Sequence, residues 1–205
     1  MYPVSFQADY FPEGRNRLTA FFRHLVAIPW LIVAALYGIA AQFAVLFAWF
    51  AMVFTGRYPE GLYNFNAGYL RMITRVNGFA YLLNDEWPPF NGQDDPAYPV
   101  RLGVPAPLDQ YSRMKALFRL IIGIPVMLLA FVQSLILSVC TLISWFAIVF
   151  TAKHPEGLFN PMRSASSYLA RAGAYFLLIT EDWPPFSDEG AGAPAGAIER
   201  ESVKQ

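Results

Sequence analysis

The residues best suited to a chemical role in this sequence are four arginines, in two groups along the chain: Arg71, Arg75, Arg163 and Arg171. A guanidinium group binds phosphate and carboxylate groups through paired hydrogen bonds. One interpretation is therefore a basic groove that holds an anionic lipid or an acidic segment of a partner protein. The alternative is that each arginine simply extends toward phosphate headgroups, as on any helix at a membrane surface.

Two pairs of adjacent carboxylates, Asp85-Glu86 and Glu181-Asp182, each precede the motif Trp-Pro-Pro-Phe. Such pairs could serve acid–base chemistry or bind a cation. Neither pair has a histidine nearby in the sequence, and a solvated helix end is the simpler interpretation. Within the motif, Trp87 and Trp183 are predicted to anchor the chain at a membrane interface. A docking peptide for a proline-recognising partner is the alternative.

A Pro-Glu-Gly turn also occurs twice, and its members are Pro59, Glu60, Gly61, Pro155, Glu156 and Gly157. Each glutamate stands where a helix is predicted to begin, and a negative charge there stabilises a helix by about 0.3 to 1 kcal/mol. The alternative is an ion pair of Glu60 with Arg23, or of Glu156 with Arg119. Either role is structural rather than catalytic.

Other constellations that carry chemistry are missing from the sequence. The two histidines, His24 and His154, stand at unrelated positions, and Cys140 is the only cysteine. There is no cluster of metal ligands, no glycine-rich phosphate loop and no nucleophile elbow. The net charge is zero, which gives no reason to expect a nucleic acid as partner. We therefore expect a protein that is not an enzyme and that needs neither metal nor cofactor.

These motifs recur because the chain is a tandem repeat. Aligning residues 2–92 with residues 98–188 at an offset of 96 needs no gap, and 28 of the 91 pairs are identical. The identities fall in blocks, such as "YPV" near each start, "WPPF" near each end, and most of "WFAMVFTGRYPEGLYN" against "WFAIVFTAKHPEGLFN". Internal duplication is the firmest conclusion from the sequence.

Each repeat contains one long run without a charged residue, at positions 25–56 and 120–152. Both runs exceed the roughly 18 residues that mark a membrane-helix candidate. The first run is also too long for the core of a signal peptide. We therefore predict an integral membrane protein that stays where its first segment inserts.

The number of crossings is left open between two interpretations. A straight helix of 32 residues is about 48 Å long, whereas the hydrocarbon core is about 30 Å thick. Each run is therefore predicted to bend into a hairpin near Tyr37-Gly38 or Gln42, and near Gln133-Ser134 or Ser138. The alternative is one tilted span per repeat. Basic residues precede both runs, at Arg15, Arg17, Arg23, Arg113, Lys115 and Arg119, and are expected on the cytoplasmic side. If both basic clusters lie on that side, each repeat must cross the membrane an even number of times, which favours the hairpin.

The remaining elements follow from hydrophobic periodicity. Apolar residues alternate at the start of each repeat, which predicts two short edge strands that pair in a small sheet outside the membrane. After each Pro-Glu-Gly turn, residues 62–83 and 159–179 predict an amphipathic helix at the membrane interface. The fold class is thus a mainly α membrane protein of two parallel repeats. The tail at 189–205 is small, polar and predicted to be disordered.

The sequence resembles a known family at these motifs. "YPV" before a strand, "RLTAFFR" before "IPW", "WFAMVFTGRYPEGLYNF" and "YLLNDEWPPF" together resemble the bacterial membrane family catalogued as domain of unknown function DUF4389, frequent in actinobacteria. The resemblance implies a bacterial membrane protein and supplies no catalytic residues. The second repeat departs from the pattern at its start, where "VRLGVPAPLDQYSR" replaces the acidic and aromatic entry motif.

The expected function is that of a non-enzymatic scaffold or accessory subunit in the bacterial cell membrane. It would be multi-pass, with its basic flanks in the cytoplasm. Its expected partners are anionic lipids and another membrane protein, and a homo-oligomer is compatible with the pattern. The alternative is a small transporter or channel component with a pathway between the repeats.

Overall fold

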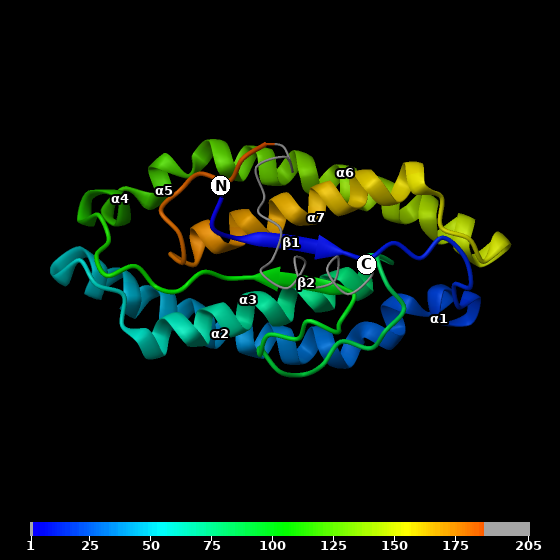
Figure 1. Cartoon of the computed structure of the whole chain (residues 1–205), viewed down its shortest axis with the longest axis horizontal. Coiled ribbons are helices and arrows are strands. Elements are labelled where there is room, and N and C mark those ends of the chain that lie inside the picture. The colour runs from blue at the N-terminus through cyan, green and yellow to red at the C-terminus, as the bar shows by residue number, and fades with distance from the viewer. Residues whose placement is uncertain (1, 187–205) are drawn as a thin grey trace, which may run out of the picture.

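The structure is a computed structural model that describes residues 2–186, so the tail at 189–205 lies outside the described residues. It is mainly helical, with one two-stranded sheet, as predicted. The first repeat contains β1 (Ser5–Ala8), α1 (Arg17–Phe21), α2 (Arg23–Thr55) and α3 (Glu60–Ala80). The second contains β2 (Val100–Gly103), α4 (Arg113–Leu117), α5 (Arg119–Ile122), α6 (Ile124–Thr151) and α7 (Glu156–Phe176). The four long helices run along the long axis of the molecule (Figure 1).

The first apolar run forms one helix, α2, and the second forms α5 and α6 with a break at Gly123, near its start. Neither run bends near its centre, so the predicted hairpin is wrong. Prolines occur only near the helix starts, where they do not force a bend in the middle. Gly38, a predicted bend, instead allows α3 to approach α2 closely. A Cβ atom at this position would lie 2.9 Å from the hydroxyl oxygen of Tyr69. Each helix ends at a residue in the left-handed conformation, Gly56 in α2 and Ala152 in α6.

The buried side of α2 is a narrow line of alanines. Every seventh residue is a buried alanine, starting with Ala20 in α1 and continuing in α2 with Ala27, Ala34, Ala41 and Ala48. A spacing of seven keeps these methyl groups on one helix face, where they permit close packing. The equivalent line in the second repeat is Ala116, Gly123, Ala130, Leu137 and Ser144. The side of each long helix opposite this line is exposed.

Among residues 2–186, the helices α2 and α6 are long and apolar enough to cross a membrane, judged by length and composition. In their most apolar stretches, only 28% of the residues of α2 and 17% of those of α6 are buried inside the protein. A core helix of a water-soluble domain would be mostly buried. The apolar side chains of these two helices therefore form an outer surface rather than a core.

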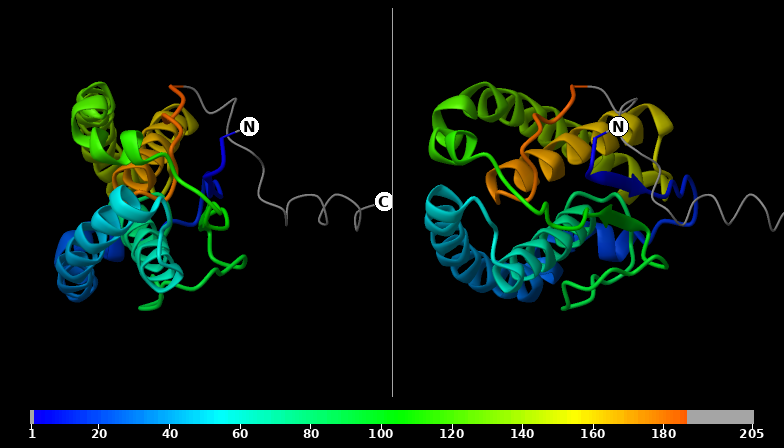
Figure 2. Two further views of the ribbon diagram at one scale, coloured as in Figure 1. Left: turned by 90° about the vertical axis from the view of Figure 1, so that its left-hand side faces the viewer. Right: turned by 60° about the vertical axis from the view of Figure 1, so that its left-hand side comes forward.

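The amphipathic helices α3 and α7 lie inside the molecule. Seen along the long axis, α2 and α6 occupy one side, α3 and α7 the middle, and the sheet the opposite side (Figure 2). About half of the residues of α3 and of α7 are buried, including Arg75 and Arg171. The expectation that the arginines of these helices extend outward is therefore wrong for Arg75 and Arg171, and a position of the helices at the membrane interface stays a prediction.

The sheet register reveals how the repeats are related. β1 and β2 are antiparallel, and Phe6 pairs with Leu102, its own equivalent in the second repeat. The flanking pairs are Ser5 with Gly103 and Gln7 with Arg101. The offset of 96 makes Arg101 the equivalent of Ser5 and Gly103 the equivalent of Gln7, so a two-fold rotation converts each of these pairs into the other. An approximate two-fold axis therefore passes through the Phe6–Leu102 pair. Each strand packs on the other repeat, β1 on α7 and β2 on α3.

The two repeats consequently run in opposite directions along the molecule, and the expectation of two parallel repeats does not hold for the directions of their long helices. The end of α2 lies beside α4, the first helix of the second repeat, because Trp49 Nε1 donates to the Ala116 carbonyl at 2.9 Å. At the opposite end, the Arg15 amide donates to the carbonyl of Ala152, just after α6, at 3.2 Å. The helices α2 and α6 therefore run in opposite directions along the molecule (Figure 1).

Candidate functional site

The largest chemically distinct feature is the outer face of α2 and α6. No charged residue occurs at positions 25–56 or 120–152. Large apolar side chains opposite the alanine line are exposed on α2 and, at equivalent positions, on α5 and α6. They are Leu25, Leu36, Phe43 and Phe54 in the first repeat and Ile121, Val132, Val139 and Phe150 in the second. Water-soluble monomers rarely expose more than a few hundred Å² of contiguous apolar surface. We call these two rows the outer stripes.

Exposed basic residues lie beyond the ends of this apolar face. Arg17 and Lys153 are at one end, and Arg57, Arg113 and Lys115 are at the other. Two of these residues form ion pairs, Lys153 with Glu13 at 2.8 Å and Lys115 with Glu181 at 3.8 Å. The apolar face is thus flanked by positive charge at both ends.

A buried charge cluster holds the end of the molecule where α2 begins. Asp85 accepts from Arg15 Nε at 2.9 Å, and Arg23 pairs with the same carboxylate. Burial by itself would raise the pKa of Asp85, but Arg15, Arg23 and the Asn16 amide together hold that pKa below its ordinary value. Arg23 also lies over the ring of Phe79, 4.2 Å from its centre. The carboxylate is therefore ionised and ties three segments together.

His154 extends this cluster into the second repeat. Its Nδ1 lies 3.4 Å from Arg15 Nη1, and its Nε2 lies 3.1 Å from Ser144 Oγ. Burial, followed by the charge of Arg15, lowers the pKa of His154 to about 4. The ring is therefore neutral at pH 7. Since a guanidinium can only donate, Nδ1 is the acceptor, and Nε2 carries the proton and donates to Ser144.

The opposite end repeats this geometry with different chemistry. Arg119 Nη2 donates to the Thr180 carbonyl at 2.7 Å, and its guanidinium lies 4.1 Å from the ring centre of Tyr175. Glu181 accepts from the Ser112 amide, as Asp85 does from Asn16. Both carboxylates therefore hold the start of a helix, and the interpretation of the acidic pairs as solvated helix ends is wrong for their first members.

The four predicted arginines do not share one environment. Arg75 donates to the carbonyls of Asn91 and Gln93, and so holds the loop after α3. Arg171 is buried and contacts Ser167 on its own helix. Arg71 is half-buried, and Arg163 is exposed. Contact with an anionic lipid or a partner stays a prediction, and the accessible members of the set are Arg71 and Arg163.

The Pro-Glu-Gly turns cap helices, and their glutamates are exposed in the first turns of α3 and α7. The alternative ion pair of Glu60 with Arg23 is wrong, because Arg23 pairs with Asp85. Gly61 and Gly157 have open space around them. Pro59 and Pro155 are the residues that precede each helix, in an extended conformation.

The two Trp-Pro-Pro-Phe motifs lie at the surface, and both tryptophans are about half exposed. Trp87 packs against Trp30, with ring centres 4.9 Å apart, and Trp30 Nε1 donates to the Pro88 carbonyl at 2.6 Å. Trp183 has no such indole beside it, because Val126 occupies the position equivalent to Trp30. The role of both tryptophans as interface anchors stays a prediction.

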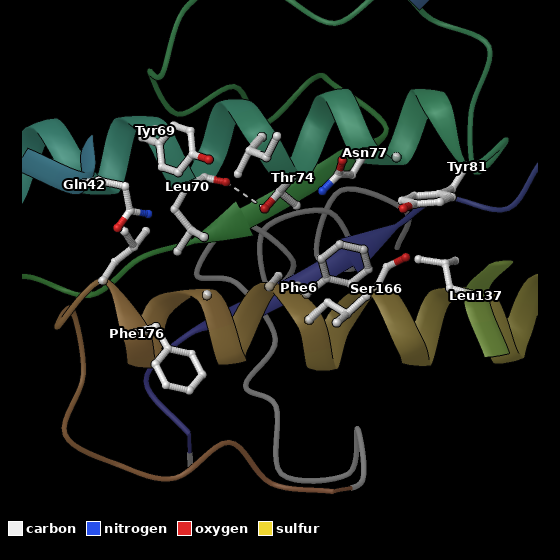
Figure 3. A pocket seen from close by; sticks show the side chains of 16 residues that line it. Phe6, Gln42, Tyr69, Leu70, Thr74, Asn77, Tyr81, Leu137, Ser166 and Phe176 are labelled. Carbon is white, nitrogen blue, oxygen red and sulfur yellow. Dashed lines mark hydrogen bonds between the residues drawn. The ribbon is translucent and has the colours of Figure 1, made fainter. Parts of the chain in front are cut away.

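A pocket of about 240 Å³ lies on the two-fold axis between α3 and α7. Phe6 of β1 lines one side, and Gln42 of α2 and Leu137 of α6 line the side of the long helices. Polar groups gather on α3, from Tyr69, Thr74, Asn77 and Tyr81, whereas α7 contributes mainly apolar or small residues (Figure 3). The lining has no charged side chain, so the pocket suits a neutral amphiphilic molecule.

Sequence reasoning missed the buried charge cluster, although a signal was present. Arg23 and Asp85 both recur as Arg119 and Glu181 at the same offset, so complementary charges flank the same helices in both repeats. Residues 2–186 include no group of three or more histidine, cysteine, aspartate or glutamate residues that could hold a metal ion.

Comparison with known proteins gives one informative result. No curated protein and no solved structure matches the chain. One family profile matches at residues 17–91 and again at residues 113–188, which together make up more than half of the sequence. These boundaries agree with the internal repeat and leave each strand outside the matched segment. The chain therefore belongs to the family described as domain of unknown function DUF4389, which it contains in two tandem copies.

Proposed function

We propose that the protein is a non-enzymatic membrane protein of the bacterial cell membrane, and that it acts as a scaffold or accessory subunit. The observation that carries this proposal is the uncovered apolar face of α2 and α6, with its two outer stripes. Hydrocarbon is the natural surrounding for such a face, because its burial removes a large apolar area from water. The basic ends would lie on the cytoplasmic side, and the lipids contacted there would be anionic.

The polar interior supports a structural role over a catalytic one. Arg15 and Arg23 share a carboxylate, and Arg75 and Arg119 donate to backbone carbonyls. Each of these groups holds a loop or a helix end in place. None of them lines the pocket, where a substrate would have to meet a catalytic group.

Membrane fractionation of the full-length chain tests the proposal. We expect the protein to remain in the membrane pellet after washing with high salt and with alkaline carbonate. Purification in mild detergent, followed by lipid and protein analysis, should then recover an anionic lipid or a stoichiometric membrane partner. A variant with Leu36→Lys and Phe43→Lys should lose membrane retention, whereas Asn64→Lys, on the exposed side of α3, should keep it. Recovery of the native chain as a monomer in detergent-free buffer would contradict membrane integration.

The axial pocket favours a second candidate, a small carrier for a neutral amphiphile. Four positions on α3 that line the pocket have their equivalents on α7 in the lining, and the C-cap residues Tyr81 and Leu177 form a fifth pair, so the pocket is built by both repeats. Repeat interfaces frame the pathway in many transporters. Flux of a neutral solute in proteoliposomes, lost in Asn77→Leu and kept in the control Asn64→Leu, would favour the carrier over the scaffold. Absence of flux for hydroxylated and carbonyl-bearing solutes would leave the scaffold as the better account.

A further inference from the structure

We infer that α2 and α6 lie in the plane of the membrane, within one leaflet, and that the approximate two-fold axis is parallel to the membrane normal. This inference rests on the proposed function, because it concerns how the apolar face meets a bilayer. The occupant of the face is the acyl-chain layer of a single leaflet. The molecule would then be inserted from one side instead of crossing the membrane.

The lengths of the helices fit this arrangement better than a crossing. α2 has 33 residues and α6 has 28, which correspond to about 50 and 42 Å at 1.5 Å per residue. The hydrocarbon core is only about 30 Å thick. An upright α2 would leave uncharged apolar turns in water, whereas a helix in the membrane plane has no limit on its length.

The position of the sheet gives a second, independent argument. β1 and β2 lie beside the middle of the long helices (Figure 1), with an ion pair between Asp9 and Arg101 at 2.9 Å. The loop after α3 passes the centre of that helix, because Gly92 contacts Gly68, and this loop continues into exposed Asp94. If the long helices crossed the bilayer, these charges would be at mid-depth, where charged groups are most unfavourable.

The antiparallel arrangement of α2 and α6 supplies a third argument, from the distribution of charge. The two ends of the molecule carry equivalent basic residues. Arg17 and Lys153 at one end correspond to Arg113 and Arg57 at the other. A crossing would place one basic end on each side of the membrane, against the tendency of basic residues to stay on the cytoplasmic side. In the membrane plane, both ends lie at the same level and meet anionic headgroups together.

The cross-section of the molecule agrees with this seating. Across the short direction the long helices come first, α3 and α7 next, and the sheet last (Figure 2). The outer stripes are apolar, whereas Asp9 and Arg101 form an ion pair beside the sheet. A helix at a membrane interface buries its apolar side about 5 to 10 Å below the headgroup boundary. The half-exposed Trp87 and Trp183 would lie near that boundary, one for each repeat.

Depth measurement along one outer stripe tests the inference. Cys140 is the only cysteine, so Cys140→Ser provides a background for single variants of the full chain. Leu25→Cys, Phe43→Cys and Phe54→Cys lie on one helix face, since 18 and 11 residues are close to whole numbers of turns. Each would carry a fluorophore in liposomes that contain phosphatidylglycerol, with quenchers attached to the lipid at shallow or deep positions.

For helices in the membrane plane, the three probes have the same depth, and the ratio of deep to shallow quenching agrees within about twofold among them. For a crossing helix, position 43 is near the bilayer centre, and positions 25 and 54 are about 27 and 16 Å from it along the helix. Quenching by the deep lipid would then be strongest at 43 and fall toward both ends. This result would overturn the inference and leave membrane integration intact.

Sidedness gives a second measurement that does not depend on the quenchers. Arg17→Cys, Arg57→Cys and Asp94→Cys should react with an impermeant maleimide from the same side of sealed vesicles. Labelling of positions 17 and 57 from opposite sides would overturn the inference. If the stripe probes report water at every position and the chain does not bind vesicles, the inference and the proposed function both fail. Variants are compared only when their unfolding midpoints match that of the Cys140→Ser parent.

Discussion

The two ends of the molecule share a backbone and differ in chemistry. Three equivalent pairs of positions define the difference, Arg15 and Tyr111, Asp85 and Glu181, and His154 and Tyr58. One end is a buried charge cluster around Asp85. The other is an aromatic contact in which the rings of Tyr58 and Tyr111 have centres 6.0 Å apart. We call these the charged end and the aromatic end.

The difference teaches that the repeats are not independent units. Each end combines residues of both repeats, because the segment before each long helix packs against the other half. Arg15 contacts His154 at the charged end, and Tyr111 contacts Tyr58 at the aromatic end. A change on one partner therefore has consequences for the other, although the two are more than 50 residues apart in sequence.

The largest expected effect is at Asp85. Asp85→Asn leaves the buried Arg15 and Arg23 without a counter-charge, and breaking a buried ion pair in this way costs roughly 3 to 5 kcal/mol. Glu181→Gln, the matched change at the aromatic end, should cost less than about 1.5 kcal/mol, since Arg119 donates to a backbone carbonyl and an amide oxygen still accepts from Ser112. Denaturant unfolding in detergent measures both. Equal losses at the two ends would show that the charge cluster has no special importance.

A double-mutant cycle sharpens the comparison between the ends. Arg15→Tyr and His154→Tyr each introduce the residue of the aromatic end into the charged end. We expect the double variant to be more stable than the sum of the single effects by roughly 0.5 to 3 kcal/mol, the usual range for contacting residues. The control pairs His154→Tyr with Arg17→Tyr, whose exposed side chain should give additive effects. Additivity in both cycles would argue against coupling between the repeats at this end.

The pH dependence of stability should also distinguish the ends. His154 has a pKa of about 4 in the folded chain, below the ordinary value of about 6.5 for an unfolded histidine. Between these values the unfolded state binds the extra proton, so stability falls as the pH is lowered from about 6.5 toward 4. The slope is at most about 1.4 kcal/mol per pH unit. His154→Gln should lose this part of the slope, whereas His24→Gln, at an exposed position, should keep it. An unchanged profile in His154→Gln would mean that folding does not lower the pKa of His154.

Much of the architecture was predictable because it depends on periodicity. The duplication, the mainly helical class, the paired strands and the uncharged helices follow from residue patterns that local geometry determines. Gly38 and Gln42 were misleading because a glycine or an amide within an apolar helix has two meanings. Gly38 is a close contact with Tyr69 in the structure, and no local pattern distinguishes a contact from a bend.

The burial of Arg75 and Arg171 could not be read from helical periodicity alone. Both arginines lie on the polar faces of amphipathic helices, and a polar face usually meets water. In this fold the strand of the opposite repeat packs on each helix, and the loop after α3 covers Arg75, which donates to the carbonyls of Asn91 and Gln93. The antiparallel arrangement of the repeats was hidden for the same reason, since it depends on the pairing of β1 with β2 across 92 or more residues.

The smallest expected effect concerns the exposed ion pair at the charged end. Lys153 Nζ lies 2.8 Å from Glu13 Oε1, and both side chains are largely exposed. Exposed pairs add little to stability because water and salt screen them. The same junction is held by backbone hydrogen bonds, from the His154 amide to the Pro12 carbonyl at 2.9 Å and from the Arg15 amide to Ala152. Lys153→Met should therefore leave the unfolding midpoint unchanged, as should Arg57→Met at the equivalent position of the aromatic end. A clear drop in Lys153→Met alone would mean that surface charge, and not the shared backbone contacts and buried cluster, joins the two repeats at this end.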